Sequence, residues 1–404
     1  MTTQMTDRSP GAAFAVVLGA ITLIGPLTIH LFLPALPEVK REFGASDSLV
    51  QLTFSIVLVT MAVATPVYGS LSDRYGRRPI LLGGFVLFLI GSLISAVATS
   101  LGILLVGRLI QAVGAACGTT LARAIARDTY GPAALVTAIA YLTMAYTLGP
   151  MISPTIGGFL IDHFGWRSEF WFALAAGTII VLAAYVIVRE THGKEEARIA
   201  ASGGMFRNYA ILMSDARFLA FVSQTGFMSV SFFAIAASSP YLMKDLLGRT
   251  ATEFGLYFMC FPFGYCLGNL VSTRISTRIG LENMVMLGSA MNFLIVAGQT
   301  LYILAGHLSP ALLFVPGGLM SFAQGLSLPN AQAGAIRVAP SLAGTAAGLG
   351  VFMQMFLSAI AAEACGVFAD GTPMPMVAIS TLGAVLAVAS AAVLYLPRKG
   401  AIAP

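Results

Sequence analysis

Long apolar segments follow one another along the whole chain, and short polar or Gly/Pro-rich stretches separate them. Each segment is close to the ~20 residues that a helix needs to cross a bilayer. Lipid offers backbone groups no hydrogen-bond partner, which favours helices over an open sheet, and a β-barrel would show shorter, alternating segments. The pattern therefore predicts an all-α polytopic membrane protein with twelve transmembrane helices. We expect these at roughly 12–33, 49–71, 79–98, 102–122, 133–160, 168–188, 217–242, 252–275, 283–305, 310–335, 342–368 and 375–396.

Composition agrees with this interpretation, since hydrophobic residues make up 57% of the 404 positions and charged residues only 10%. Soluble domains carry about 25% charged residues, so this chain cannot cover a water-facing surface. The net charge of +5 is dispersed without a basic run, which argues against nucleic-acid binding. The four cysteines form no C-x-x-C pair, so we expect packing roles and no disulfide or metal site. The first segment continues to Leu33 without a cleavage site, which indicates a membrane helix rather than a signal peptide.

The positions of lysine and arginine predict the orientation of the chain. If the N-terminus is inside, 16 of the 22 Lys and Arg residues lie on the inner side and five on the outer side. Cytoplasmic loops carry such an excess, so both termini are expected in the cytoplasm. The longest polar stretch, 189–216, then becomes a cytoplasmic linker between two six-helix bundles, 1–188 and 217–404.

The two halves resemble each other at a constant offset of 204 residues. Asp73–Gly84 aligns without gaps onto Thr277–Gly288. A duplicated, pseudo-symmetric six-helix unit is typical of a transporter built from two rocking halves. The matched pairs are Arg74 with Arg278, Gly76 with Gly280, Gly84 with Gly288, Lys40 with Lys244, Gly44 with Gly248 and Phe54 with Phe258.

The segment GSLSDRYGRRPILLGG follows the second helix and resembles the G-x-L-a-D-r-x-G-r-r motif of the major facilitator superfamily. The resemblance implies the major facilitator fold. It also implies a gate in which Asp73 faces the positive end of helix 11 near Ser341 and Arg77 meets Asp128. The alternative is a positively charged topology loop without a moving part. The matching residues are Gly69, Leu71, Asp73, Arg74, Gly76, Arg77 and Arg78.

A charged residue lies inside the fourth helix, in GRLIQAVGAACG. Because burying a charge in a membrane is costly, Arg108 is a candidate functional residue. The segment is similar to the R-x-x-Q-G sequence of drug:proton antiporters, where the arginine is linked to proton movement. Arg108 and Gln111 match, although Ala112 and Val113 precede Gly114. Alternatively, Arg108 snorkels to the outer interface or donates hydrogen bonds to backbone carbonyls.

The fifth helix contains closely spaced glycines and prolines that resemble the antiporter pattern G-x-x-x-G-P-x-x-G-G. Prolines bend a membrane helix, and glycines let helices 5 and 8 approach closely. The resemblance implies a seal against leak and favours export over import; the alternative is helix packing alone. The matching residues are Gly149, Pro150, Pro154, Gly157 and Gly158.

The first helix, IGPLTIHLFLPALP, resembles the bicyclomycin/chloramphenicol-resistance branch, whose membrane-embedded aspartate is replaced here by His30. Histidine titrates near pH 6.5 when unperturbed, so His30 is a candidate for proton coupling. It could instead donate a hydrogen bond to substrate while neutral, or simply pack. Glu363, in the outer part of helix 11, is a second candidate for coupling, and its alternatives are attraction of cationic drugs or an inert interfacial position.

Further residues offer the aromatic, flexible and amide surfaces that suit a polyspecific binding site, although each could equally be a packing residue. With His30, the candidates are Gln111, Tyr141, Phe227, Phe232, Phe261, Gln354 and Met355.

These features together predict a proton-coupled exporter of small amphiphilic or phenicol-type drugs in a bacterial cytoplasmic (inner) membrane. We expect alternating access driven by the proton gradient, no cofactor, no enzymatic activity and a monomer. A proton-coupled symporter or facilitator of a small metabolite is the main alternative. A membrane enzyme or receptor fits less well, because the sequence contains no recognisable catalytic triad, ATP-binding loop or soluble output domain.

Overall fold

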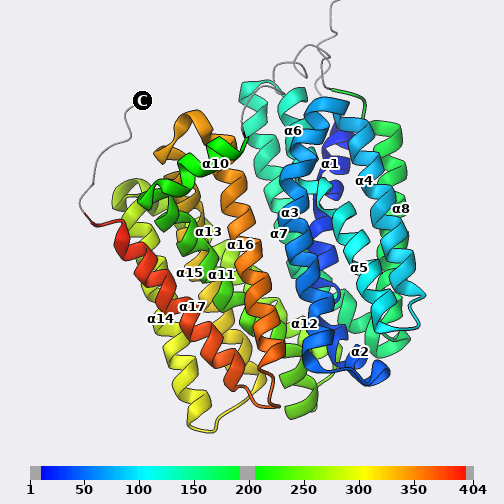
Figure 1. Ribbon diagram of the computed structural model, residues 1–404, viewed down its shortest axis with the longest axis vertical. Coiled ribbons are helices and arrows are strands. Elements are labelled where there is room, and N and C mark those ends of the chain that lie inside the picture. Colours follow the sequence, from blue (N-terminus) through cyan, green and yellow to red (C-terminus); the bar gives the residue numbers. More distant parts are fainter. Residues whose placement is uncertain (1–10, 192–204, 397–404) are drawn as a thin grey trace, which may run out of the picture.

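The computed structural model describes residues 11–191 and 205–396, and this part of the chain is helical without any strand. Twelve of its helical segments are long and apolar enough to cross a membrane, which confirms the all-α prediction. Several helices extend beyond the predicted apolar segments, because polar residues near their ends continue the helix. Figure 1 shows the helices running roughly alongside one another in two groups.

The first half contains α1 (Ala12–His30), the short 3₁₀ helix η1 (Leu33–Ala35), α2 (Leu36–Phe43), α3 (Asp47–Tyr75), α4 (Arg77–Ala96), α5 (Leu101–Ala115), α6 (Cys117–Thr129), α7 (Pro132–Phe164) and α8 (Arg167–Ile187). The first membrane span is interrupted at η1, where Pro34 and Pro37 each remove a backbone donor. The fourth span consists of α5 and α6, which join at Ala116.

The second half contains α11 (Ala216–Tyr241), the π-helical turn η3 (Leu242–Leu246), α12 (Ala251–Phe258), α13 (Cys260–Ile279), α14 (Leu281–Leu304), α15 (Pro310–Val338), η4 (Pro340–Leu342), α16 (Ala343–Val367) and α17 (Met374–Val393). A further helix, α10 (Met205–Ser214), lies inside the expected linker 189–216. The other described residues of that linker are 189–191 and 215–216.

The two halves repeat each other in packing and in backbone conformation. In the first half α4 packs on α5 and α8, and in the second half α14 packs on α15 and α17. Gly76 (φ 98°, ψ 154°) separates α3 from α4, and Gly280 (φ 89°, ψ 156°) separates α13 from α14 in the same way. Gly44 and Gly248 likewise share a positive φ, 58° and 62°. The backbone therefore repeats at the offset of 204 residues seen in the sequence.

We name the two ends of the molecule after these glycines. The Gly76 end carries Gly76 and Gly280, and the Gly44 end carries Gly44 and Gly248. Figure 1 shows α10 at the upper end of the molecule and α2 at the lower end, which is the Gly44 end.

The halves are joined at the Gly44 end. Arg41 of α2 pairs with Asp245 of η3 at 3.0 Å, and the Thr155 hydroxyl of α7 donates to the Gly255 carbonyl of α12 at 2.9 Å. The Asp162 carboxylate accepts hydrogen bonds from the first backbone N–H groups of α12. Across the two described ranges, every hydrogen bond between the halves lies at this end.

Glycine makes the closest of these contacts possible. A Cβ atom on Gly158 of α7 would lie 2.1 Å from the Ala251 carbonyl oxygen, and one on Gly255 of α12 would lie 2.4 Å from the Pro154 carbonyl oxygen. At the opposite end, Gly344 and Gly348 of α16 have open space beside them. Among the described glycines, those that let the two halves approach closely therefore all lie at the Gly44 end.

Gly158→Ala should separate α7 from α12, because the added methyl group cannot fit beside the Ala251 carbonyl. We expect a lower melting temperature and a longer distance between spin labels placed at Phe164 and Leu256, measured by pulsed electron paramagnetic resonance. Gly298→Ala is the matched control, since nothing lies within 4 Å of its added Cβ. Equal label distances in both variants would show that this contact does not hold the Gly44 end closed.

Candidate functional site

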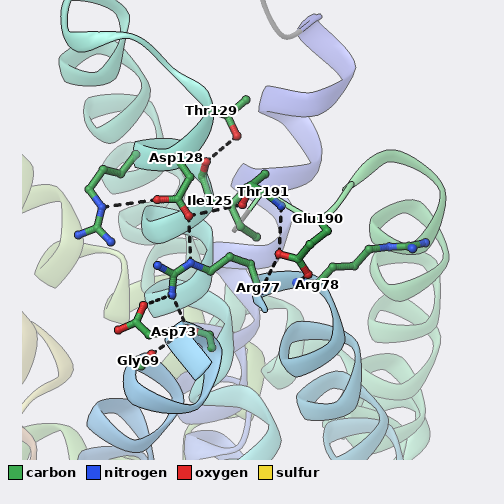
Figure 2. A network of polar contacts seen from close by, with 11 residues as sticks. Gly69, Asp73, Arg77, Arg78, Ile125, Asp128, Thr129, Glu190 and Thr191 are labelled. Carbon is green, nitrogen blue, oxygen red and sulfur yellow. Dashed lines mark hydrogen bonds and ion pairs between the residues drawn. The ribbon is translucent and has the colours of Figure 1, made fainter. Parts of the chain in front are cut away.

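A charged cluster lies at the Gly76 end around Arg77, the first residue of α4. Arg77 is only 3% exposed, and its guanidinium donates to Asp128 of α6 at 3.0 Å, to the Ser72 hydroxyl at 2.7 Å and to the Asp73 carboxylate. Burial of this cation is offset by two carboxylates, and charge-assisted hydrogen bonds of this kind are the strong ones. The expected pair of Arg77 with Asp128 is therefore present, and Figure 2 shows it beside Asp73.

The expected contact of Asp73 with helix 11 is not described, because the side chain of Ser341 lies outside the described ones. Asp73 instead remains on Arg77 within the first half. Arg78 donates to the Tyr185 carbonyl at 2.8 Å, whereas Arg74 stacks over the neighbouring Tyr75 ring. The motif lies mostly within helices, since Gly76 is the single residue between α3 and α4.

Glu190, just beyond the end of α8, completes this cluster. Its two carboxylate oxygens accept the backbone N–H groups of Arg77 at 2.9 Å and Arg78 at 3.1 Å (Figure 2). A carboxylate at a helix N-terminus is stabilised by the unpaired N–H groups and the helix dipole. A Cβ on Gly76 would lie 2.6 Å from this carboxylate, so Gly76 is required for space as well as for its positive φ. The start of the linker is thereby attached to the motif.

Arg108 of α5 is buried in the first half, with 1% of its surface exposed. Its guanidinium donates to the backbone carbonyls of Thr53 on α3 and Thr28 on α1, both at 3.1 Å, and to the Gln111 amide oxygen at 2.8 Å. It also lies 4.5 Å from the centre of the Phe32 ring. The snorkelling alternative is therefore excluded in this conformation, whereas the carbonyl contacts of the other alternative are present.

Gln111 serves to position Arg108 in this conformation rather than to face a ligand. It is 1% exposed, and its amide nitrogen donates to the Ser92 hydroxyl of α4 at 2.9 Å. Both ends of its amide are thus occupied by protein groups.

Glu169, in the first turn of α8, is a buried acid that the sequence analysis missed. It is 1% exposed, and neither of its carboxylate oxygens has a hydrogen-bond partner among the described residues. It lies beside Gly157 of α7, where an added Cβ would come within 2.7 Å of it. Among the described residues, Arg108 is the cation that acts on it electrostatically.

His30 points from the end of α1 toward the second half. Its ring is 6% exposed and lies 5.9 Å from the Phe258 ring and 6.5 Å from the Phe233 ring. His30 and Arg108 share no hydrogen bond in the described structure. The ring belongs to an aromatic cluster at the interface between the halves, whose other members are Phe54, Phe232, Phe233, Phe254, Tyr257, Phe258, Phe261 and Phe314.

The glycines of α7 face two different neighbours. Gly158 contacts α12, as expected for helices 5 and 8, but Gly149 packs against Pro26 of α1 and Gly157 against the Leu31 carbonyl. The expectation that the whole pattern faces helix 8 is thus wrong for two of its glycines, because the other face of α7 packs along α1. Pro150 and Pro154 both lie inside α7.

Glu363 of α16 joins the two halves at the Gly44 end. Its carboxylate accepts the Ser55 hydroxyl of α3 at 2.6 Å and the Ser48 hydroxyl at 3.2 Å. The carboxylate therefore holds α16 against α3 in this conformation.

The remaining candidate binding residues are dispersed. Phe261 is fully buried and Phe232 half-buried in the aromatic cluster, whereas Tyr141 is exposed near the Gly76 end of α7. Phe227, Gln354 and Met355 are half-buried on α11 and α16. The structure brings His30 and Phe232 to one cluster but does not assemble the whole set around a single point.

Comparison with known proteins agrees with this architecture. The sequence profile of the Major Facilitator Superfamily matches residues 18–362. A bicyclomycin resistance protein homolog from Haemophilus influenzae is 25% identical over 404 residues, covering 98% of each chain. Multidrug resistance protein D from Escherichia coli K12 is 26% identical over 350 residues, covering 85% of each. The crystal structure of a POT family transporter in complex with 5-aminolevulinic acid has a TM-score of 0.76 at 13% identity and covers 96% of this chain and 97% of that chain.

Glu190→Ala should weaken the start of α4, because it removes a carboxylate that accepts two backbone N–H groups. Loss of such a cap costs about 1 kcal/mol, so we expect the melting temperature of the purified protein to fall by a few degrees. Glu282→Ala is the control, since Glu282 forms a partly exposed pair with Arg217. A Glu190→Ala protein as stable as the Glu282→Ala protein would contradict the capping role.

Proposed function

Because the chain belongs to the Major Facilitator Superfamily, we propose that it exports small amphiphilic drugs in exchange for protons across a bacterial cytoplasmic membrane. The match to a bicyclomycin resistance protein homolog over nearly the whole of both chains, together with the match to multidrug resistance protein D, supports drug efflux. The substrate class that we favour is neutral, phenicol-like compounds, because few acids lie in the membrane-embedded region.

The mechanism rests on one observation, namely that the halves contact each other through backbone at the Gly44 end and not at the Gly76 end. In a two-half transporter this is a state closed on one side of the membrane. The excess of Lys and Arg supports a cytoplasmic position for the Gly76 end and both termini. The described conformation is then closed toward the periplasm and open inward. The rocking units are residues 1–188 and 217–404, with 189–216 as the cytoplasmic linker.

We propose that the cluster of Asp73, Arg77 and Asp128 is the gate that closes the cytoplasmic side in the outward-open state. In the inward-open state Asp73 pairs with Arg77 of its own half, and 38% of its side chain is exposed. When the Gly76 ends approach, its carboxylate becomes available to the start of α16, where helix N–H groups attract negative charge. The antiporter glycines and prolines of α7 would maintain the seal on the periplasmic side.

Proton movement supplies the energy, without a cofactor, and a monomer contains all the parts. Arg108 and His30 lie in the membrane-embedded interior, and Glu363 lies between α3 and α16. Ionisable groups in such positions mark proton pathways in transporters. Arg108, held by carbonyls of α1 and α3, is placed to respond to movements of either helix.

Expression in an efflux-deficient bacterium should raise the minimum inhibitory concentrations of chloramphenicol, bicyclomycin or related drugs several-fold, and a protonophore should abolish the increase. Asp73→Asn should lose this resistance while still inserting in the membrane, since the gate needs its negative charge. Asp370→Asn is the control, because Asp370 is exposed and hydrogen-bonded only to nearby Thr372. Susceptibility unchanged across a broad drug panel would reject drug export.

Arg108→Ala should remove pH-driven drug flux in proteoliposomes, because no other cation can take the place held by the Thr28 and Thr53 carbonyls. Arg217→Ala, which breaks only a partly exposed ion pair, should transport normally. Flux is measured with radiolabelled chloramphenicol after imposing an acidic lumen. Full activity of Arg108→Ala would assign Arg108 to packing.

A further inference from the structure

We propose that Glu169 is the carboxyl group that carries the proton in the exchange, and that the approach of Arg108 causes Glu169 to release this proton. This inference rests on the proposed proton-coupled function and names the group that binds the proton. It concerns an acid in the first turn of α8, away from the gating motif and from Glu363.

The first argument is the isolation of the carboxylate. Glu169 is 1% exposed, and among the described residues neither oxygen accepts a hydrogen bond. An ionised carboxylate without donors is strongly destabilised in an apolar interior, and such a group takes up a proton instead. The lack of any described donor therefore favours the protonated, neutral form of Glu169 in this conformation. Glu363 differs, because two hydroxyl groups donate to it.

The second argument is a matching unsatisfied donor on Arg108. Its Nε and Nη1 atoms are occupied by the Thr53 and Thr28 carbonyls and by Gln111, but its buried Nη2 has no described partner. Arg108 and Glu169 act on each other electrostatically, yet no ion pair joins them within 4.0 Å. The two groups are thus near neighbours that are held apart.

The third argument is depth in the membrane. Glu169 is the third residue of α8, about 3 Å along the helix from its Gly44 end, whereas Arg108 is about 10 Å along α5. Toward the Gly44 surface, Glu38 of α2 is the next carboxylate that acts on Glu169, and Glu38 lines a pocket with Lys244 and Arg249. Glu169 therefore lies closer to the Gly44 surface than Arg108 does.

The other charged groups around Glu169 are engaged elsewhere in the described structure. On α8 itself, Arg167 pairs with Glu42 at 2.7 Å. Of the helices packed against α8, α1 contributes His30, which faces the aromatic cluster, and α7 contributes Asp162 and His163. Asp162 is bound to Thr252 and His163 to the Phe159 carbonyl. The charged residues of α4, Arg77 and Arg78, lie at the opposite end. Arg108 and Glu38 remain as the groups that set its charge.

The proton balance is simple. In the outward-open state water protonates the Glu169 carboxylate, forming one O–H bond and leaving the site neutral for the conformational change. In the inward state that O–H bond breaks when Nη2 of Arg108 moves onto the carboxylate, because a nearby cation favours the ionised form. The proton is taken up by water that enters the site in the inward state, and no electrons are exchanged.

The direct test needs no drug. Infrared difference spectra of the purified full-length protein should contain a protonated-carboxyl band at neutral pH, and Glu169→Gln should lose it. Glu253→Gln is the matched control, an exposed acid at the same end whose capping role glutamine can keep. Persistence of the full band in Glu169→Gln would overturn the proposal.

The functional test uses proteoliposomes and radiolabelled chloramphenicol. Glu169→Gln should lose uptake driven by an acidic lumen while keeping exchange of labelled for unlabelled drug, which needs no proton and shows that the variant folds. Glu169→Asp keeps an acid and should retain pH-driven uptake with a shifted pH profile. Intact pH-driven uptake in Glu169→Gln would overturn this inference alone, whereas its absence in the wild type would reject the proposed function and the inference together.

Discussion

Every arrangement in this molecule has to satisfy one constraint, namely that a charge removed from water must find compensating groups within the protein. A charged side chain at the centre of a membrane helix costs at least a few kcal/mol. Arg77 meets the constraint with two carboxylates and a hydroxyl, whereas Arg108 meets it with two backbone carbonyls and an amide. The first solution ties three helix ends together at the surface, and the second ties α1 and α3 to α5 in the interior.

The contacts between the halves follow a different rule. At the Gly44 end they depend on the absence of side chains, since Gly158 and Gly255 let backbones touch where any Cβ would collide. Polar contacts accompany this backbone contact, namely the Arg41–Asp245 ion pair and the hydrogen bonds to Asp162 and Glu363, and they must break when this end opens. The contacts of Arg77 and Arg108 lie within the first half and need not break when the halves move apart.

Much of the fold could be predicted from the sequence, because a bilayer demands long apolar helices and because the duplicated unit keeps its glycines. The pair of Arg77 with Asp128 could be predicted too, since the motif is specific. Glu169 could not, because its neighbours Arg167 and Trp166 suggest an interfacial position, and only three-dimensional packing shows that α1 and α7 bury it. Glu190 lies in a polar stretch, where a helix cap formed across more than a hundred residues leaves no local signal. The candidate binding residues could not be predicted as one site for a related reason. The packing of neighbouring helices decides which face of each helix lines the interior.

The two glycine junctions of the repeat share a backbone but not a chemistry. At Gly76 the flanking positions are Asp73 and Arg77, whereas the equivalent positions around Gly280 are Thr277 and Leu281. A gene duplication would have produced two equal junctions, and the geometry has been kept in both, whereas an arginine buried between two carboxylates is present in one. The charged residues next to Gly280 are Arg278 and Glu282, and Glu282 pairs with Arg217 instead. Salt and charge substitutions should therefore affect the two junctions unequally, acting on a buried cluster at Gly76 and on a partly exposed ion pair at Gly280.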